Sequence, residues 1–214
     1  MIQTAEKYST LPRLVIVSNE VHYWVEIEKS VCENPDMFRT FGRSEYCTKK
    51  EHGLAIHAHE AYAFQNLPAF SPPLTEFALG IVLNVFFARA LNDRLPPSTP
   101  LIVNTVNPGL CKTEIMREAK GIQAFVAALL QRILAFTAEE GSRQLVWAAV
   151  GGQPQNLRGQ YITSSHVSEV SDFALGPQGI KAQNQLWDEL VDILGEVDPR
   201  VTVTVNNYLA PNSA

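Results

Sequence analysis

Residues 101–106 form a mainly apolar, β-branched run that stops at a turn-forming Asn-Pro-Gly sequence, residues 107–109. Such a run is typical of a strand buried on both faces, as in a parallel sheet. Residues 14–17 repeat this pattern, and residues 160–163 form a third, shorter candidate strand. Because helical patterns lie between the strands, the sequence predicts an α/β fold with a parallel sheet.

Four helices are expected between and after these strands, at residues 82–95, 122–136, 138–150 and 177–195. The third has a clear start, because Thr137 and Glu140 have the spacing of a capping box. The second has its apolar residues on one helical face and is shorter than the ~20 residues that a membrane-spanning helix needs. We therefore predict that it packs on protein and that the chain has no transmembrane segment. Residues 201–214 are expected to form a loose tail.

The composition excludes several classes of function. With 214 residues, 46% of them hydrophobic, the chain is long enough for one domain with an apolar core. The formal net charge of -5 and the lack of a basic block argue against a nucleic-acid partner. The three cysteines have no zinc-type spacing, and the N-terminal segment has no apolar signal region. A reducing, cytoplasmic location and no metal site are therefore expected.

Polar residues follow the first two predicted strands. Ser18 and Asn19 come directly after the first strand, and residues 107–113 follow the second. Ligands of doubly wound sheets bind outside the carboxyl ends of strands, so both segments are candidate ligand sites. In the second segment a Pro-Gly turn lets the backbone approach a planar amide, and Thr113 adds a hydroxyl. An ordinary strand-to-helix turn is the alternative reading of these residues.

Tyr46 and Lys50 form a Tyr-x-x-x-Lys sequence. On a helix, residues four positions apart share one face. A nearby ammonium stabilises the phenolate and lowers the pKa of a tyrosine from ~10 towards the working pH. Tyr46 is thus a candidate general acid/base for a carbonyl/alcohol pair, although this spacing also arises often by chance.

In their order and setting, these features resemble the short-chain dehydrogenase/reductase superfamily, and within it the retinol-dehydrogenase-like branch common in fungi. The segments that carry the resemblance are residues 13–24, 82–91, 103–115, 139–151 and 186–201. The resemblance implies the C-terminal part of a Rossmann-like doubly wound parallel sheet, with the N-terminal βαβ half missing. It also implies a single partial domain over residues 1–200.

The resemblance further implies the roles of the site residues. Tyr46 would be the proton donor/acceptor, and Lys50 would lower its pKa and hold the nicotinamide ribose. Asn19 stands where the family has its catalytic serine, with Ser18 beside it. The carboxamide of NADP or NAD would be clamped by the loop after the second strand, through Pro108, Gly109, Cys111 and Thr113.

The sequence departs from the family in three ways. It lacks the Gly-x-x-x-Gly-x-Gly loop that cradles the cofactor pyrophosphate. An asparagine replaces the catalytic serine. Residues 51–81 separate Lys50 from the helix that normally follows it. Either residues 51–81 are an insertion and Tyr46 and Lys50 are retained, or a gapless alignment places Phe77 and Ile81 at the two positions. We favour the first alignment, because it keeps the required residue types.

Two hypotheses of function follow. The first is an oxidoreductase that interconverts a carbonyl and an alcohol with NADP(H) or NAD(H), acting on a small lipophilic or polyketide-like substrate in secondary metabolism. A homo-oligomer is a further expectation for such an enzyme. The second hypothesis is a truncated, non-catalytic remnant or interaction protein, because the phosphate loop is absent and a fold alone does not prove activity.

Overall fold

The structure is a computed structural model that describes residues 1–41, 54–56, 72–112, 128–129 and 131–210. For residues 54–56 and 72–78 it describes the backbone and not the side chains. Its main sheet has the strand order β1-β4-β5-β6, formed by β1 (Arg13–Val17), β4 (Ile102–Asn107), β5 (Tyr161–Thr163) and β6 (His166–Ser168). The first three strands are parallel, and β6 is antiparallel to β5. The three predicted strands and the α/β fold class are thus confirmed.

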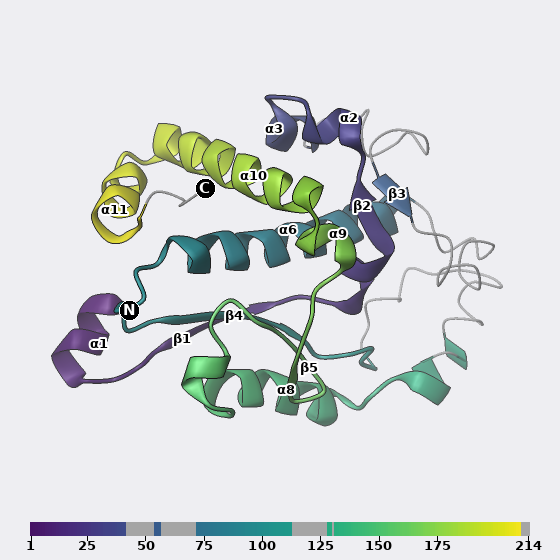
Figure 1. Cartoon of the computed structure of the whole chain (residues 1–214). Coiled ribbons are helices and arrows are strands. Elements are labelled where there is room, and N and C mark those ends of the chain that lie inside the picture. Colours follow the sequence, from purple (N-terminus) through teal and green to yellow (C-terminus); the bar gives the residue numbers. More distant parts are fainter. Residues whose placement is uncertain (42–53, 57–71, 113–127, 130, 211–214) are drawn as a thin grey trace.

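Helices cover both faces of this sheet. Figure 1 shows α6 (Pro72–Arg94) and α10 (Pro177–Val197) on one side of the strands and α8 (Ala138–Val150) on the other. Along β4, Ile102 and Val106 pack in one hydrophobic cluster with Ala148 of α8. Val103 packs in another cluster with Ala88 of α6. Side chains alternate between the faces of a strand, so β4 is buried on both faces as predicted.

The first strand is less buried than its sequence predicts. All of β1 is partly buried or exposed, and Val17 is 50% exposed. Within the described residues β1 pairs only with β4, which makes it an edge strand. The apolar run therefore predicted the strand correctly, but the prediction that both of its faces are buried was wrong.

The predicted helix starts and ends are confirmed in part. Thr137 Oγ1 accepts a hydrogen bond from Glu140 N (3.2 Å), and Glu140 Oε2 accepts one from Thr137 N (2.7 Å), so the capping box is formed at the start of α8. Helix α6 begins at Pro72, ten residues earlier than the predicted start at residue 82. Of the predicted helix 122–136, residues 128–129 and 131–134 are described and helical.

The segment predicted to be a loose tail begins with a helix, α11 (Arg200–Tyr208), which packs on α10. Ala210 N donates a hydrogen bond to Arg94 O at the end of α6 (2.7 Å), and Leu209 packs against the hydrophobic cluster that contains Ala88 of α6. The β-branched residues of α11 are poor helix formers, so these contacts with α6 and α10, which the local sequence does not reveal, stabilise this helix.

Several short elements have no counterpart in the prediction. They are α1 (Ile2–Tyr8), η1 (Glu20–Trp24), β2 (Val25–Ile27), α2 (Lys29–Cys32), α3 (Met37–Phe41), β3 (Leu54–Ile56), η3 (Pro154–Asn156), β6 and α9 (Asp172–Leu175). Strand β6 was missed because Ser164 and Ser165 form the hairpin turn, both with positive φ (50° and 61°). Two-residue hairpin turns with positive φ usually contain Asn-Gly or Asp-Gly, and the Ser-Ser sequence lacks this signal. In the part of the chain that the structure describes, no helix has both the length and the apolar character to span a bilayer.

Candidate functional site

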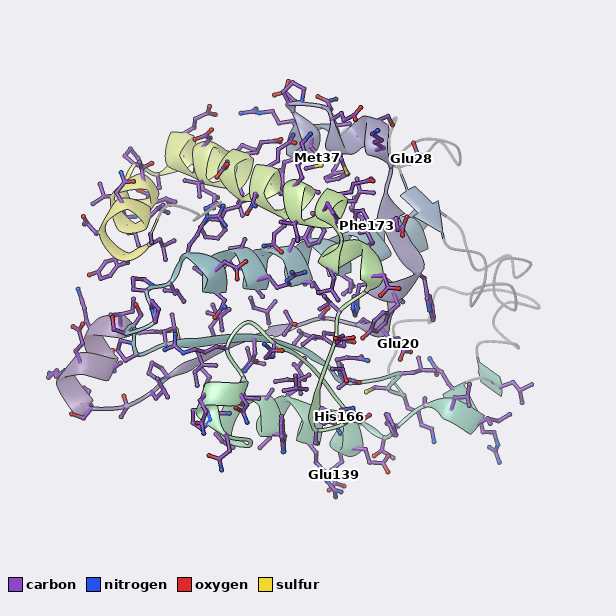
Figure 2. All side chains as sticks on the ribbon, viewed as in Figure 1. Glu20, Glu28, Met37, Glu139, His166 and Phe173 are labelled. Carbon is purple, nitrogen blue, oxygen red and sulfur yellow. The ribbon has the colours of Figure 1, made fainter. Side chains whose placement is uncertain are left out.

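The carboxyl ends of the parallel strands bring three polar side chains to one edge of the sheet. Val17 is in register with Val106, and Asn107 with Thr163, so Ser18, Asn107 and Thr163 end neighbouring strands. Ser18 N donates a hydrogen bond to Val106 O (2.8 Å), which continues the pairing by one residue. This edge is where ligands of doubly wound sheets bind. Figure 2 shows Glu20, in η1, at the same end of the sheet.

The loop after β4 is fixed by its own hydrogen bonds. Asn107 Oδ1 accepts from Gly109 N (2.9 Å), while Asn107 Nδ2 donates to Thr163 Oγ1 (3.4 Å). Gly109 has a φ of 79°, and a Cβ at this position would lie 2.7 Å from the ring of Phe136. Phe136 also exchanges backbone hydrogen bonds with residues 110 and 112. Phe136 therefore anchors the loop after β4, a role that was not predicted from the sequence.

Ser18 and Asn19 occupy different environments. The Ser18 side chain is 1% exposed, and its Oγ has no hydrogen-bond partner among the described residues. Asn19 is the N-cap of η1, where its Oδ1 accepts a hydrogen bond from Val21 N (3.1 Å). The asparagine carbonyl is therefore used for local structure. Ser18 carries the buried hydroxyl that is still available for another group.

An aromatic pocket opens beside these residues and was not predicted. It has a volume of about 250 Å³ and is lined by Glu20, Tyr23, Trp24, Asn107, Tyr161 and Thr163. Tyr161 is 1% exposed and lies two residues before the end of β5, on the same face as Thr163. Because residues two positions apart in a strand share a face, the place of Tyr161 two residues before Thr163 was the one sequence signal that it belongs to the site.

His22 packs against Tyr23 and Tyr161, two of the rings that line the aromatic pocket. Its ring meets the ring of Tyr161 edge-on, with 4.6 Å between the centroids, and its Nδ1 lies 2.7 Å from Asn19 O. Because a carbonyl only accepts, Nδ1 carries the proton, and Nε2 is left as an acceptor without a partner among the described residues. Burial lowers the pKa of His22, which the hydrogen bond to Asn19 partly offsets. Burial also raises the pKa of Tyr161, as do the nearby Tyr23 and Glu20, while the Asn107 side chain lowers it.

The lowered pKa of His22 predicts how stability depends on pH. The unfolded chain takes up a proton at His22 near pH 6.5, whereas the folded chain does so only at lower pH. The contribution of His22 to stability is therefore fully present above pH 6.5 and is lost as the pH falls below it. Urea unfolding should show a lower free energy of unfolding at pH 5.5 than at pH 7.5.

Two variants isolate this effect. His22→Gln should reduce the difference in unfolding free energy between the two pH values, because glutamine does not titrate. His166→Gln, at an exposed position, serves as the control. If His22→Gln showed the same pH dependence as the unaltered chain, the buried imidazole would not be its source.

The remaining predicted site residues divide into two groups. Pro108, Gly109 and Cys111 lie in the described loop, and Cys111 Sγ contacts the carbonyl oxygens of the other two residues at 3.6 Å each. Tyr46, Lys50 and Thr113 lie outside the described residues, so their roles stay predictions. Among the described residues, no group of three His, Cys, Asp or Glu side chains is placed to hold a metal ion.

Comparison with known proteins finds fungal dehydrogenases that are similar to part of this chain. The chain is 32% identical over 132 residues to a short-chain dehydrogenase of Penicillium roqueforti, a match that covers 58% of this chain and 34% of that protein. It is 34% identical over 127 residues to a short chain dehydrogenase/reductase of Cryptosporiopsis sp., covering 59% and 38%. A short chain dehydrogenase of Aspergillus sclerotiorum is 26% identical over 183 residues, covering 84% and 43%. No protein-family profile matches the chain.

These matches show that the chain is similar to short-chain dehydrogenases/reductases of fungi. The resemblance predicted from the sequence is thus confirmed. The matched part of the chain spans about a third of the length of the first two relatives. What the whole relatives do is therefore carried over to this chain only as a proposal.

Proposed function

We propose that the chain supplies the substrate end of an oxidoreductase that interconverts a carbonyl and an alcohol with NADP(H) or NAD(H). The observation that carries the proposal is the meeting of Ser18, Asn107 and Thr163 at the carboxyl edge of a parallel sheet, beside a pocket lined by aromatic residues. The names of the relatives support the same class of reaction. A small lipophilic or polyketide-like substrate, a role in secondary metabolism, a cytoplasmic location and assembly as a homo-oligomer belong to this proposal.

The described residues fit one end of the dinucleotide. The loop of Pro108, Gly109 and Cys111 follows β4 and is held in a fixed turn, so its backbone is placed to bind a planar carboxamide. The bound cofactor would supply the hydride. The sequence has no Gly-x-x-x-Gly-x-Gly loop, which is the usual cradle for the pyrophosphate. The chain therefore fits the nicotinamide end of the cofactor and not its phosphates.

The proton and the carbonyl oxygen are assigned to the chain's own side chains. Tyr46 would give or take the proton, with Lys50 lowering its pKa. Ser18 Oγ, buried at the end of β1, would donate a hydrogen bond to the carbonyl oxygen. Asn19 contributes less in this proposal, since its side-chain oxygen caps η1.

A non-catalytic protein is the second candidate, and two observations favour it. Helix α6 runs unbroken from Pro72, as the gapless alignment requires. In that alignment the position of the lysine is taken by Ile81, which is 7% exposed and packs in the main hydrophobic cluster. A chain with isoleucine there has no ammonium to hold the ribose or to tune a tyrosine.

Turnover of the full chain tests the choice between them. At cofactor concentrations high enough to offset the missing phosphate contacts, we expect consumption of NADPH or NADH in the presence of aryl aldehydes and ketones, and a higher rate for Asn19→Ser. Serine is as good an N-cap as asparagine, so this variant keeps η1 while adding the hydroxyl that the family uses. Absence of turnover in both proteins, with the fold intact by circular dichroism, would favour the non-catalytic protein.

A further inference from the structure

The Tyr161 hydroxyl makes no hydrogen bond of normal geometry with the described residues, although its side chain is almost fully buried. The nearby Asn107 side chain lowers the pKa of Tyr161, but its Oδ1 accepts from Gly109 N and its Nδ2 can only donate, so the phenolic proton has no acceptor. Buried hydroxyls without a partner are rare in native proteins and call for an explanation. Since Tyr161, Asn107 and Thr163 all line the aromatic pocket, a ligand in that pocket is the partner that fits.

The aromatic residues of η1 that line the pocket are held in place. Tyr23 and Trp24 belong to η1, and the Tyr23 hydroxyl donates a hydrogen bond to Glu169 O, which fixes its ring. The rings of Tyr23 and Tyr161 are nearly perpendicular, with 6.0 Å between their centroids. Glu20 adds an exposed carboxylate to the lining. The pocket thus combines flat aromatic surfaces with the Tyr161 hydroxyl as a donor and the Glu20 carboxylate as an anionic acceptor.

We propose that this pocket binds a neutral phenol. The aromatic ring of the ligand packs against Tyr23 and Trp24, and its hydroxyl oxygen accepts a hydrogen bond from Tyr161 while its proton is donated to Glu20. This deepens the proposed function, on which it rests, by naming the substrate class of the same site.

The ring, the size and the hydroxyl of the ligand each match a feature of the pocket. Aromatic rings attract one another beyond the area that they bury, so a flat ring is favoured over a saturated one. The volume of about 250 Å³ lies just below the range usual for drug-sized ligands, which limits the ligand to one or two rings. A carboxylate ligand would be repelled by Glu20. An aryl ether would accept from Tyr161 but would have no proton for Glu20.

Isothermal titration calorimetry of the full chain with 2-naphthol tests the proposal, and it needs neither cofactor nor turnover. We expect saturable binding of 2-naphthol, with weaker binding of 2-methoxynaphthalene and no measurable binding of 2-naphthoate. Tyr161→Phe keeps the ring and removes the hydroxyl, so 2-naphthol should bind about five- to tenfold more weakly. Tyr8→Phe, at a position that is 61% exposed, is the matched control and should bind like the unaltered chain.

The melting temperature separates this role from a structural one. Removing a buried hydroxyl that has no partner should leave the Tm of Tyr161→Phe unchanged or higher. A lower Tm would mean that the hydroxyl has a partner within the protein and would overturn the proposal. So would equal affinity of 2-naphthol for the unaltered chain and Tyr161→Phe, or binding of 2-naphthoate as tight as that of 2-naphthol. Loss of carbonyl turnover with phenol binding intact would instead contradict only the oxidoreductase.

Discussion

Replacing Tyr46 with Phe is expected to lower the rate of carbonyl reduction about 10²–10⁴-fold, the usual contribution of a general acid. The substitution removes the phenolic proton and keeps the ring, so affinity for the cofactor should change little. Lys50→Ala should reduce both the rate and the affinity, because this lysine is proposed both to tune the phenol and to hold the ribose. The measurement is kcat and the cofactor KM of the chain on a panel of aryl aldehydes.

Two comparisons make this prediction decisive. Tyr8→Phe, a tyrosine-to-phenylalanine change on the surface, should keep the full rate. Equal turnover by the unaltered chain and Tyr46→Phe would mean that Tyr46 is not the acid, and its assignment would have to be withdrawn. Absence of turnover in both proteins would instead favour the gapless alignment. In that case the double variant Phe77→Tyr with Ile81→Lys should gain activity, at a cost in stability because Ile81 is buried.

The strands and the helix caps could be predicted because their signals are local. The buried run of β4 and the capping box of α8 each lie within a few consecutive residues, and the structure confirms both. The exposure of β1 and the helix α11 depend on which partners surround them. A single sequence contains no direct signal for such partners, so both predictions failed.

In the candidate site, too, residues with a local sequence signal were predicted and residues that depend on distant contacts were missed. Ser18 and the loop after β4 were found because they follow strands, and the parallel register does bring them to one edge. Tyr161 and Phe136 were missed, since each joins the site through contacts with residues more than twenty positions away. The tyrosine also lies inside a strand, where an aromatic residue has an ordinary structural explanation.

Among the glycines of the described residues, Gly179 is the position where substitution by alanine should be most destabilising, by about 2–4 kcal/mol. Gly179 lies in the first turn of α10, where the chain packs against α9. Figure 2 shows Phe173 of α9 close to this start of α10. A Cβ at Gly179 would lie 2.0 Å from Phe173 O and 2.8 Å from its carbonyl carbon. These are backbone atoms, so relief requires that α9 and α10 move apart.

Gly80→Ala is the matched control with the opposite expected sign. Gly80 lies in the middle of α6 and is exposed, and a Cβ there would meet nothing within 4 Å. Alanine should therefore stabilise the chain by about 0.5–1 kcal/mol, because it restricts the unfolded backbone and favours the helix. Urea unfolding of the two variants gives both free energies. A loss below 1 kcal/mol for Gly179→Ala would mean that the contact between α9 and α10 is looser than described, and a loss for Gly80→Ala would mean that α6 is covered on that side.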